Sequence, residues 1–230
     1  MWGVRKQYLT SKNLLDTGGI LCFAASWAGK DYVLFDSVQQ SGEEAMLRSV
    51  HALLEEADVV VTYNGNSFDI PMLNREFLKY KLLPPAPYKS VDVYRVVRSK
   101  FRFASNKMDD VLKELGFGGK THHRGLMLWL ECMQGKKDAW KEMEEYNVND
   151  VVELENLYDR VLPWITNHPN HSLYVESTVC PNCGGNHFQQ RGWAYTRTFK
   201  YKRLQCKDCG TWSRSTAREP LVLTDRVVSI

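Results

Sequence analysis

Val59-Val60-Val61-Thr62-Tyr63-Asn64-Gly65-Asn66-Ser67-Phe68-Asp69 is an apolar run that breaks at an Asn-Gly turn and ends in a carboxylate. A β-branched run bounded by turn residues predicts a buried strand. Pro71 lies just inside the amphipathic segment that follows, so it indicates the start of a helix. Asp69 is therefore expected where a strand passes into a helix, the edge at which α/β folds hold ligands and metals.

Four residues of this segment match the pattern Tyr-Asn-x-x-x-Phe-Asp: Tyr63, Asn64, Phe68 and Asp69. The pattern resembles the second exonuclease motif in the proofreading domains of family B DNA polymerases. A helix N-cap is the competing interpretation of Asp69, because aspartate is favoured there without any metal. The match of the whole pattern favours metal binding.

A second motif follows at Tyr146 and Asp150, which are four residues apart and so lie on one face of a predicted helix. The spacing resembles the Tyr-x-x-x-Asp motif of the DEDDy class of RNase H-like 3′-5′ exonucleases. Alone it is weak evidence, because a core tyrosine and a solvated aspartate produce it in many helices. Both motifs occur in the family's order, so the chain resembles this family over roughly residues 2–171, in particular phage-type stand-alone members with a C-terminal zinc ribbon.

The resemblance implies an α/β fold, with an RNase H-like mixed sheet flanked by helices, and two-metal hydrolysis of phosphodiesters from a 3′ end. Asp69, Tyr146 and Asp150 would be catalytic, with Asp69 and Asp150 holding Mg²⁺ or Mn²⁺ and Tyr146 orienting water or phosphate. Asn64 and Phe68 would lie at the substrate, although Asn64 also suits a structural role in the turn. The expected partner is nucleic acid, as a single strand or 3′ end with DNA favoured over RNA, and any proofreading would serve a separate polymerase or replication protein.

The family's first motif, an Asp-x-Glu on the opening strand, does not occur before Asp69. The opening residues 1–8 resemble the segment that follows that strand, so we expect the chain to begin one strand late. Two carboxylates are too few to fix two divalent ions, so we expect little turnover from this chain unless such a strand precedes it. The alternative is a non-catalytic nucleic-acid-binding protein with a degenerate exonuclease fold. Asp92 is a conceivable substitute ligand, but its position before a predicted helix favours a capping role.

Four of the six cysteines form two Cys-x-x-Cys pairs, Cys180 with Cys183 and Cys206 with Cys209. In a cytosolic setting such twinned pairs predict a tetrahedral zinc site rather than disulfides. A redox pair is the competing interpretation. His187 follows the first pair closely enough to suggest a ligand, but four thiolates already close a structural site.

The segment between the cysteine pairs interleaves aromatic and basic residues. Such a ribbon can stack bases and hold phosphates, so Arg197, Lys200 and Lys202 are the predicted nucleic-acid contacts. The competing interpretation is a small ribbon core, with aromatic side chains on one strand face and solvated lysines on the other. Both interpretations are open at this point.

Composition is that of an ordinary globular protein, with 43% hydrophobic and 25% charged residues. The net charge of +3 is too small to indicate nucleic-acid binding, although basic residues concentrate in the C-terminal part. No apolar run approaches the roughly 18 to 20 residues that span a bilayer, and the N-terminus lacks the layout of a signal peptide. These features predict a cytoplasmic protein without a membrane partner, in the host cytoplasm if a phage encodes it.

Apolar periodicity and turn residues divide the chain into elements. We expect a hairpin over residues 20–35, a helix after a capping box at Ser41 to Glu44, a helix over 71–81, a strand near 90–94, and helices over 105–115, 126–133 and 138–162. A proline and a polar segment then indicate a boundary. The predicted domains are an exonuclease domain (1–171), a four-cysteine zinc ribbon (172–214) and a tail (215–230).

Overall fold

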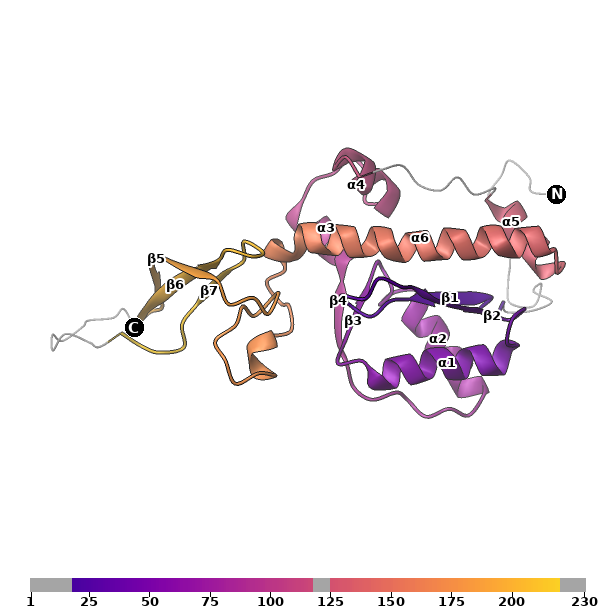
Figure 1. The fold of residues 1–230 in the computed structure, drawn as a ribbon, viewed down its shortest axis with the longest axis horizontal. Helices are drawn as coiled ribbons and strands as arrows, with labels where there is room; N and C mark the ends of the chain where they lie inside the picture. The colour runs from indigo at the N-terminus through magenta and orange to yellow at the C-terminus, as the bar shows by residue number, and fades with distance from the viewer. Residues whose placement is uncertain (1–17, 118–124, 220–230) are drawn as a thin grey trace.

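A computed structural model shows a mixed α/β protein with a small β-sheet module near its C-terminal end (Figure 1). The structure describes residues 18–117 and 125–219. The predicted opening segment at 1–8 and most of the predicted tail lie outside these residues. In the described ranges, no helix combines the length and the apolar character needed to cross a membrane.

The elements follow the predicted order. The strands are β1 (Cys22–Ala25), β2 (Leu34–Ser37), β3 (Val59–Thr62), β4 (Lys89–Asp92), β5 (Phe188–Tyr195), β6 (Lys200–Cys206) and β7 (Trp212–Arg214). The helices are α1 (Glu43–Glu56), α2 (Asp69–Lys79), α3 (Val93–Lys100), α4 (Met108–Glu114), α5 (Leu126–Met133) and α6 (Lys137–Val161), with short 3-10 helices at Leu162–Trp164 and His171–Leu173. These bounds agree with the predicted elements to within a few residues.

Strand pairing combines antiparallel and parallel ladders. β1 and β2 form the predicted antiparallel hairpin, with Cys22 opposite Ser37. β3 and β4 run parallel, with Thr62 opposite Asp92 at their carboxyl ends. Parallel strands need a crossover connection, and the segment containing α2 supplies it. The described strands of this part therefore form two small sheets with different pairing.

Helices cover the strands from two sides (Figure 1). α6 contacts β1 and β2 along one side, while α1 and α2 lie on the other. The main buried cluster joins Leu157 and Val161 of α6 to Val91 of β4 and to Val93 and Val97 of α3. This apolar packing holds β4 and α3 against α6, and so fixes the edge where β3 and β4 end.

The start of α1 differs from the prediction. Gly42 occupies the N-cap position with a φ of 81°, and among the described residues no side chain caps the helix. The Ser41 and Gly42 amides donate to the carbonyls of Ser37 and Val38, so Ser41 already belongs to the preceding turn. The predicted capping box at Ser41 to Glu44 is therefore wrong, and glycine is used because the left-handed backbone favours it.

The C-terminal sheet is anchored to the end of α6. Asn182 is buried, and its Nδ2 donates to the carbonyl oxygens of Leu162 at 3.0 Å and Ile165 at 2.9 Å. Cys183 and Cys209 pack against the main buried cluster. These bonds satisfy carbonyls that the end of a helix leaves without intrahelical partners. The cysteine end of the ribbon thus docks on the helix that carries the second motif.

Candidate functional site

The first predicted motif lies at the carboxyl ends of β3 and β4. Thr62, the last residue of β3, is opposite Asp92, the last residue of β4. The turn after β3 brings the backbone of Asn64 back to this edge, and its N–H donates to Asp92 Oδ1 at 2.9 Å. Because Asp92 is buried, this bond joins the two strand ends inside the protein. A neighbouring strand therefore holds the motif turn in place.

The Asn-Gly turn needs both of its residue types. Asn64 has a φ of 63°, in the left-handed region that asparagine tolerates better than most residues. Gly65 is buried, and a Cβ on it would lie 2.6 Å from the Cβ of Thr62. The amides of Phe68 and Ile70 donate to the Gly65 carbonyl at 3.2 and 2.9 Å. These bonds lead the chain directly from the turn into α2.

Two side-chain hydrogen bonds tie the motif to other parts of the domain. The Tyr63 hydroxyl donates to the carbonyl of Asn106 at 2.6 Å, and its ring meets the Tyr94 ring edge-on at 5.7 Å. Burial raises the pKa of Tyr63 to about 12, so it remains a neutral donor. The Ser90 hydroxyl donates to Asn66 Oδ1 at 2.7 Å. The turn is thus held from α3, from β4 and from the segment before α4.

Asp69 is the first residue of α2, and Phe68 occupies the N-cap position. Within the described residues no side chain caps this helix, so the N-cap interpretation of Asp69 is wrong. The Asp69 side chain is exposed, yet surrounding protein removes part of its hydration. This desolvation, and then the negative charge of Asp92, raise the pKa of Asp69 above its usual 3.8. Two carboxylates placed this way would be stabilised by a cation.

Asp92 has a role different from the predicted cap. It occupies the N-cap position of α3, but in the described structure its side chain makes no cap hydrogen bond. Oδ1 accepts from Asn64, while Oδ2 is buried without a hydrogen-bond partner among the described residues, and Arg95 Nε lies 3.7 Å from it. The capping interpretation of Asp92 is therefore wrong. The sequence does hold a signal for this role: Asp92 ends the strand that follows the motif helix. Parallel strands bring their carboxyl ends to one edge of a sheet, which would place Asp92 near Asp69.

An open groove of about 430 Å³ lies beside the motif turn. Its lining comes from the turn and from α3: Asn64, Ser67, Tyr94, Arg95, Arg98 and Ser99. Phe68 of the same turn is 63% exposed, which is unusual for a phenylalanine. The two predicted substrate contacts, Asn64 and Phe68, are therefore accessible, and two arginines add positive charge next to them.

Tyr146 and Asp150 lie one turn apart on α6, and both are half-buried. The Tyr146 ring packs edge-on against Trp129 of α5, with ring centroids 6.2 Å apart, and contacts the buried cluster between these helices. The ring thus makes the contacts of a core tyrosine, which is compatible with a polar role for its hydroxyl.

The aspartates are not all gathered at one point. Asp92 is the carboxylate whose charge acts on Asp69. Considering the described residues alone, Asp69, Asp92 and Asp150 do not form a group whose oxygens all lie within 4.8 Å of one another. The structure therefore adds Asp92 to the predicted site and leaves Asp150 at the second motif on α6.

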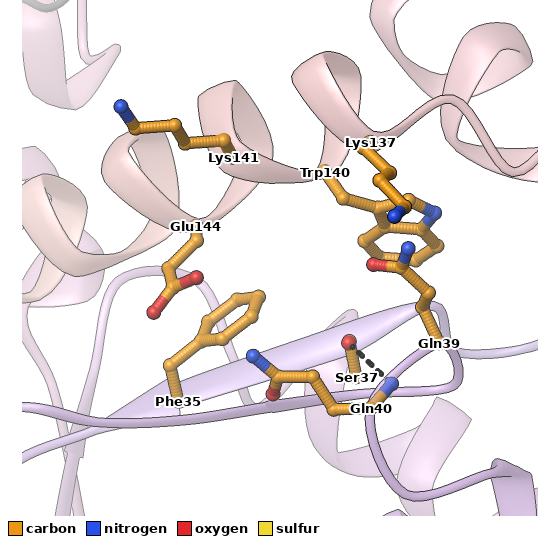
Figure 2. A pocket seen from close by; sticks show the side chains of 8 residues that line it. All are labelled: Phe35, Ser37, Gln39, Gln40, Lys137, Trp140, Lys141 and Glu144. Atoms are coloured by element: carbon orange, nitrogen blue, oxygen red, sulfur yellow. Dashed lines mark hydrogen bonds between the residues drawn. The ribbon is translucent and has the colours of Figure 1, made fainter.

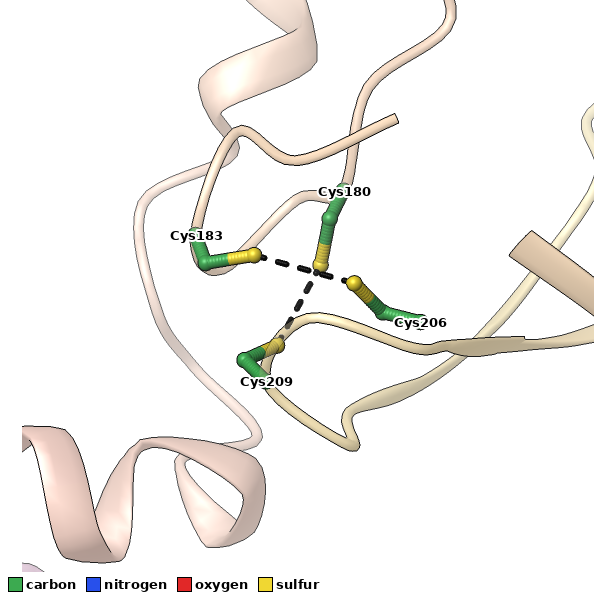
Figure 3. Close-up of side chains that lie close together, drawn as sticks. All are labelled: Cys180, Cys183, Cys206 and Cys209. Carbon is green, nitrogen blue, oxygen red and sulfur yellow. Dashed lines mark hydrogen bonds between the residues drawn. The ribbon is translucent and has the colours of Figure 1, made fainter. Parts of the chain in front are cut away.

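The four paired cysteines converge at one point (Figure 3). Their Sγ atoms all lie within 4.8 Å of one another, and the Cys180–Cys209 and Cys183–Cys206 sulfurs are each 3.7 Å apart. A tetrahedral zinc ion with Zn–S bonds of about 2.3 Å requires sulfurs about 3.8 Å apart, whereas a disulfide requires about 2.05 Å. The cysteines are free thiols with spacing that fits a zinc ion.

The surroundings of the cysteines suit a bound cation. The Gly185 N–H donates to Cys183 Sγ at 3.4 Å. Burial raises the pKa of the Cys183 thiol, so a nearby positive charge is needed to hold its thiolate. His187 lies outside the group, because its Nδ1 is 2.8 Å from Asp208 Oδ1 at an exposed position. The ligand set is therefore four sulfurs.

Comparison with known families agrees with this arrangement. A family model described as the RNase H superfamily matches residues 15–162. The chain belongs to the RNase H superfamily. The match includes both predicted motifs and ends before Cys180, the first of the four paired cysteines. No curated protein matches the chain.

Membership of the RNase H superfamily gives the chain a nuclease-like role in nucleic-acid processing, because members are typically nucleases that commonly use divalent metals. The RNase H-like fold predicted from the motifs is confirmed at this level, and the mixed α/β arrangement fits it. The 3′-5′ exonuclease subtype and the specific metals stay predictions.

The RNase H superfamily domain has a second cavity, of about 260 Å³, between β2 and the start of α6 (Figure 2). Its lining is mainly polar: Phe35, Ser37, Gln39, Gln40, Lys137, Trp140, Lys141 and Glu144. The Gln40 backbone N–H donates to the Ser37 hydroxyl at 3.2 Å. None of the predicted site residues lines this cavity, so it is separate from the motif turn.

Proposed function

We propose that this member of the RNase H superfamily is a metal-dependent 3′-5′ exonuclease that acts on nucleic acid, with DNA as the favoured substrate. The observation that carries the proposal is the placement of Asp69 beside Asp92 at the carboxyl edge of β3 and β4. Open α/β folds hold ligands at this edge. The turn before Asp69 also matches the second exonuclease motif. This match supports metal-dependent hydrolysis of phosphodiesters as the reaction at this edge.

Asp69, Asp92 and Asp150 would hold Mg²⁺ or Mn²⁺. Carboxylate oxygens are the donors that these hard ions prefer. Desolvation and the charge of Asp92 both raise the pKa of Asp69, and a cation between the two carboxylates would relieve both effects. Once bound, such ions lower the pKa of a water molecule and stabilise the leaving oxygen.

Other residues of the site would bind and orient the substrate. Asn64 and Phe68 would contact the terminal nucleotide, and the groove arginines, Arg95 and Arg98, would bind its phosphates. The Tyr146 hydroxyl would orient the attacking water or the scissile phosphate. A nuclease of this kind would serve a separate polymerase or replication protein.

The four cysteines would bind one structural Zn²⁺. Four thiolates complete a tetrahedron, so no coordination position is left for water or substrate. The ion would instead hold the two Cys-x-x-Cys segments together, in a module too small to bury a large core of its own. Its location against the end of α6 supports this structural role.

A non-catalytic nucleic-acid-binding protein is the second candidate, and one observation favours it. In the part of the chain that the structure describes, Asp69, Asp92 and Asp150 do not converge within 4.8 Å. Oxygens that share one Mg²⁺ at about 2.1 Å lie within about 4.2 Å of one another, so the three carboxylates do not jointly bind one ion in this arrangement. Release of nucleotides distinguishes the two candidates.

The test follows release of mononucleotides from a single strand labelled at its 3′ end, in the presence of Mg²⁺ or Mn²⁺. We expect slow, metal-dependent release that Asp69→Ala and Asp150→Ala abolish and Tyr146→Phe only reduces, because water orientation contributes less than charge stabilisation. An apolar strand with Asp-x-Glu placed before the chain is expected to raise the rate. Asp138→Ala, at an exposed acid, is the matched control. Binding without release in both forms would contradict the exonuclease and support the second candidate.

A further inference from the structure

The C-terminal sheet has two chemically different faces. β6 pairs with β7 so that Arg203 is opposite Arg214 and Gln205 is opposite Trp212. Because side chains alternate along a strand and cross-strand partners share a face, these four residues lie on one face together with Tyr201. A bulge between Gln190 and Trp193, with Gly192 at a φ of 75°, shifts the alternation of β5.

Three arginines stack on the aromatic rings of this face. The guanidinium carbons of Arg191 and Arg203 lie 5.6 and 5.3 Å from the centre of the Trp212 ring, and that of Arg214 lies 4.1 Å from Tyr201. Contacts at these distances are cation–π interactions. We call this group, Arg191, Arg203, Arg214, Trp212 and Tyr201, the arginine face.

Hydrogen bonds further fix two of these side chains. Arg203 Nε donates to the Arg191 carbonyl at 2.8 Å, and Arg191 Nη1 donates to Gln205 Oε1 at 2.9 Å. Each bond uses one N–H of a guanidinium that has five. The remaining N–H donors of each planar guanidinium group are held in a fixed orientation, and their spacing matches the oxygens of a phosphate group.

Among residues 125–219, no acid forms an ion pair with the arginine face. The ion pairs of the described ribbon residues join His187 to Asp208 and Lys202 to Glu219, and neither involves these arginines. Three positive charges on one small face repel one another unless an anionic partner binds. The face is therefore complementary to a chain of negative charges.

The opposite face carries Lys200 and Lys202, two of the nucleic-acid contacts predicted from the sequence. Trp193 is opposite Lys202 and Tyr195 is opposite Lys200, so these four residues share the other face. The Lys200 Nζ lies 4.7 Å from the Trp193 ring, and Lys202 is 3.9 Å from a Glu219 carboxylate oxygen. This face has fewer cations, and one of them already has an acidic neighbour.

We propose that the arginine face binds the sugar-phosphate backbone of single-stranded nucleic acid. This inference rests on the proposed function in taking nucleic acid as the ligand. The Tyr201 ring is buried, and the half-exposed Trp212 ring has two guanidinium groups near it, so we assign these rings the role of orienting the arginines. Direct contacts are charge-assisted bonds to phosphate, which hold a strand without reading its sequence.

The location of the ribbon allows one strand to contact both sites. The sheet extends away from the C-terminal end of α6 (Figure 1). Val161, the last residue of α6, is eleven residues beyond Asp150, which is about 16 Å at about 1.5 Å per residue. That distance corresponds to about five stacked nucleotides at about 3.4 Å each. The arginine face would therefore hold the strand several nucleotides away from the 3′ end.

The test measures binding of the full chain, purified with Zn²⁺, to a labelled thymidine oligonucleotide of about 20 nucleotides across a salt series. Each phosphate contact to a single strand contributes about −0.7 to the slope of log K against log salt. We expect the triple variant Arg191→Gln, Arg203→Gln, Arg214→Gln to reduce that slope by about 2 and to weaken binding about tenfold or more near 0.1 M salt. The matched comparison, Arg197→Gln with Lys200→Gln and Lys202→Gln, removes the same charge at the contacts predicted from the sequence, and we expect it to weaken binding less than the arginine variant does.

The melting temperature and the zinc content show whether the glutamine variant folds. If it folds poorly, a second variant provides the test. Arg→Lys at the same three positions keeps the charge but removes the planar fork, and is expected to lose part of the affinity while keeping most of the salt slope. Equal losses in the arginine variant and its matched comparison, or no loss in either arginine variant, would overturn the proposal. Equally tight binding of poly-glutamate would also overturn it in favour of an acidic protein partner. The assay contains no Mg²⁺ or Mn²⁺ and reads binding alone, so absence of hydrolysis does not affect its outcome.

Discussion

Replacing Asp92 tests whether β4 holds the candidate site together. Its Oδ1 accepts the Asn64 N–H at 2.9 Å, and its side chain is 2% exposed. A buried hydrogen bond to a charged acceptor contributes about 1.5–3 kcal/mol, while removing a buried carboxylate recovers part of its desolvation cost. We expect Asp92→Ala to lower the free energy of unfolding by about 2 kcal/mol, and Asp92→Asn by about 1 kcal/mol because the amide oxygen can still accept.

The assay is urea and thermal unfolding followed by circular dichroism. A loss of about 2 kcal/mol corresponds to a fall in melting temperature of roughly 4–8 °C for a domain of this size. Asp58→Ala, at an exposed acid just before β3, is the control and should change stability by less than about 0.5 kcal/mol.

The same variants test the link between the two carboxylates. The charge of Asp92 contributes to the raised pKa of Asp69, so Asp92→Asn should lower that pKa. Titration of the Asp69 carboxyl by NMR measures this change. An Asp92→Ala protein as stable as the Asp58→Ala control, or an unchanged Asp69 titration, would show that these residues do not form one site.

Three further predictions follow from the same geometry. Gly65→Ala places a methyl group 2.6 Å from Thr62 Cβ, so it should lower the free energy of unfolding, measured in urea, by about 1–3 kcal/mol. Gly19→Ala is the control and should not lower it, because the added methyl group has its nearest contact at an ordinary 3.5 Å. Metal analysis should find about one zinc per chain, lost in Cys183→Ser and kept in Cys132→Ser, and zinc content unchanged by Cys183→Ser would contradict the four-sulfur site. Because the folded-state pKa of Asp69 lies above 3.8, folding disfavours its charged form, and this cost is present at neutral pH and relieved as the pH falls below the folded pKa. Asp69→Asn should therefore raise the melting temperature at pH 7 and change it little near pH 3, and a lower melting temperature at pH 7 would argue against this environment.

The order and type of the elements could be predicted from the sequence because they depend on local patterns. The apolar run at Val59 to Thr62 and the Asn-Gly turn after it dictate a strand, a sharp turn and a helix within a few residues. The four-cysteine site could also be predicted from the sequence, because each Cys-x-x-Cys pair places two sulfurs on one turn and a tetrahedral zinc ion needs two such pairs. The predicted capping box at Ser41 was wrong because the Ser41 N–H donates to the Ser37 carbonyl, which makes Ser41 part of the preceding turn.

The partners of these local features were decided only by the tertiary structure. Asp92 is 23 residues from Asp69 in the chain, and only the parallel pairing of β3 with β4 makes them neighbours. In the ribbon, the pairing of β6 with β7 and the bulge in β5 separate the arginines from the lysines, a division that the interleaved sequence does not reveal. Strand pairing and register depend on hydrogen bonds between distant segments, whereas the sequence pattern specifies only which side chains alternate within each one.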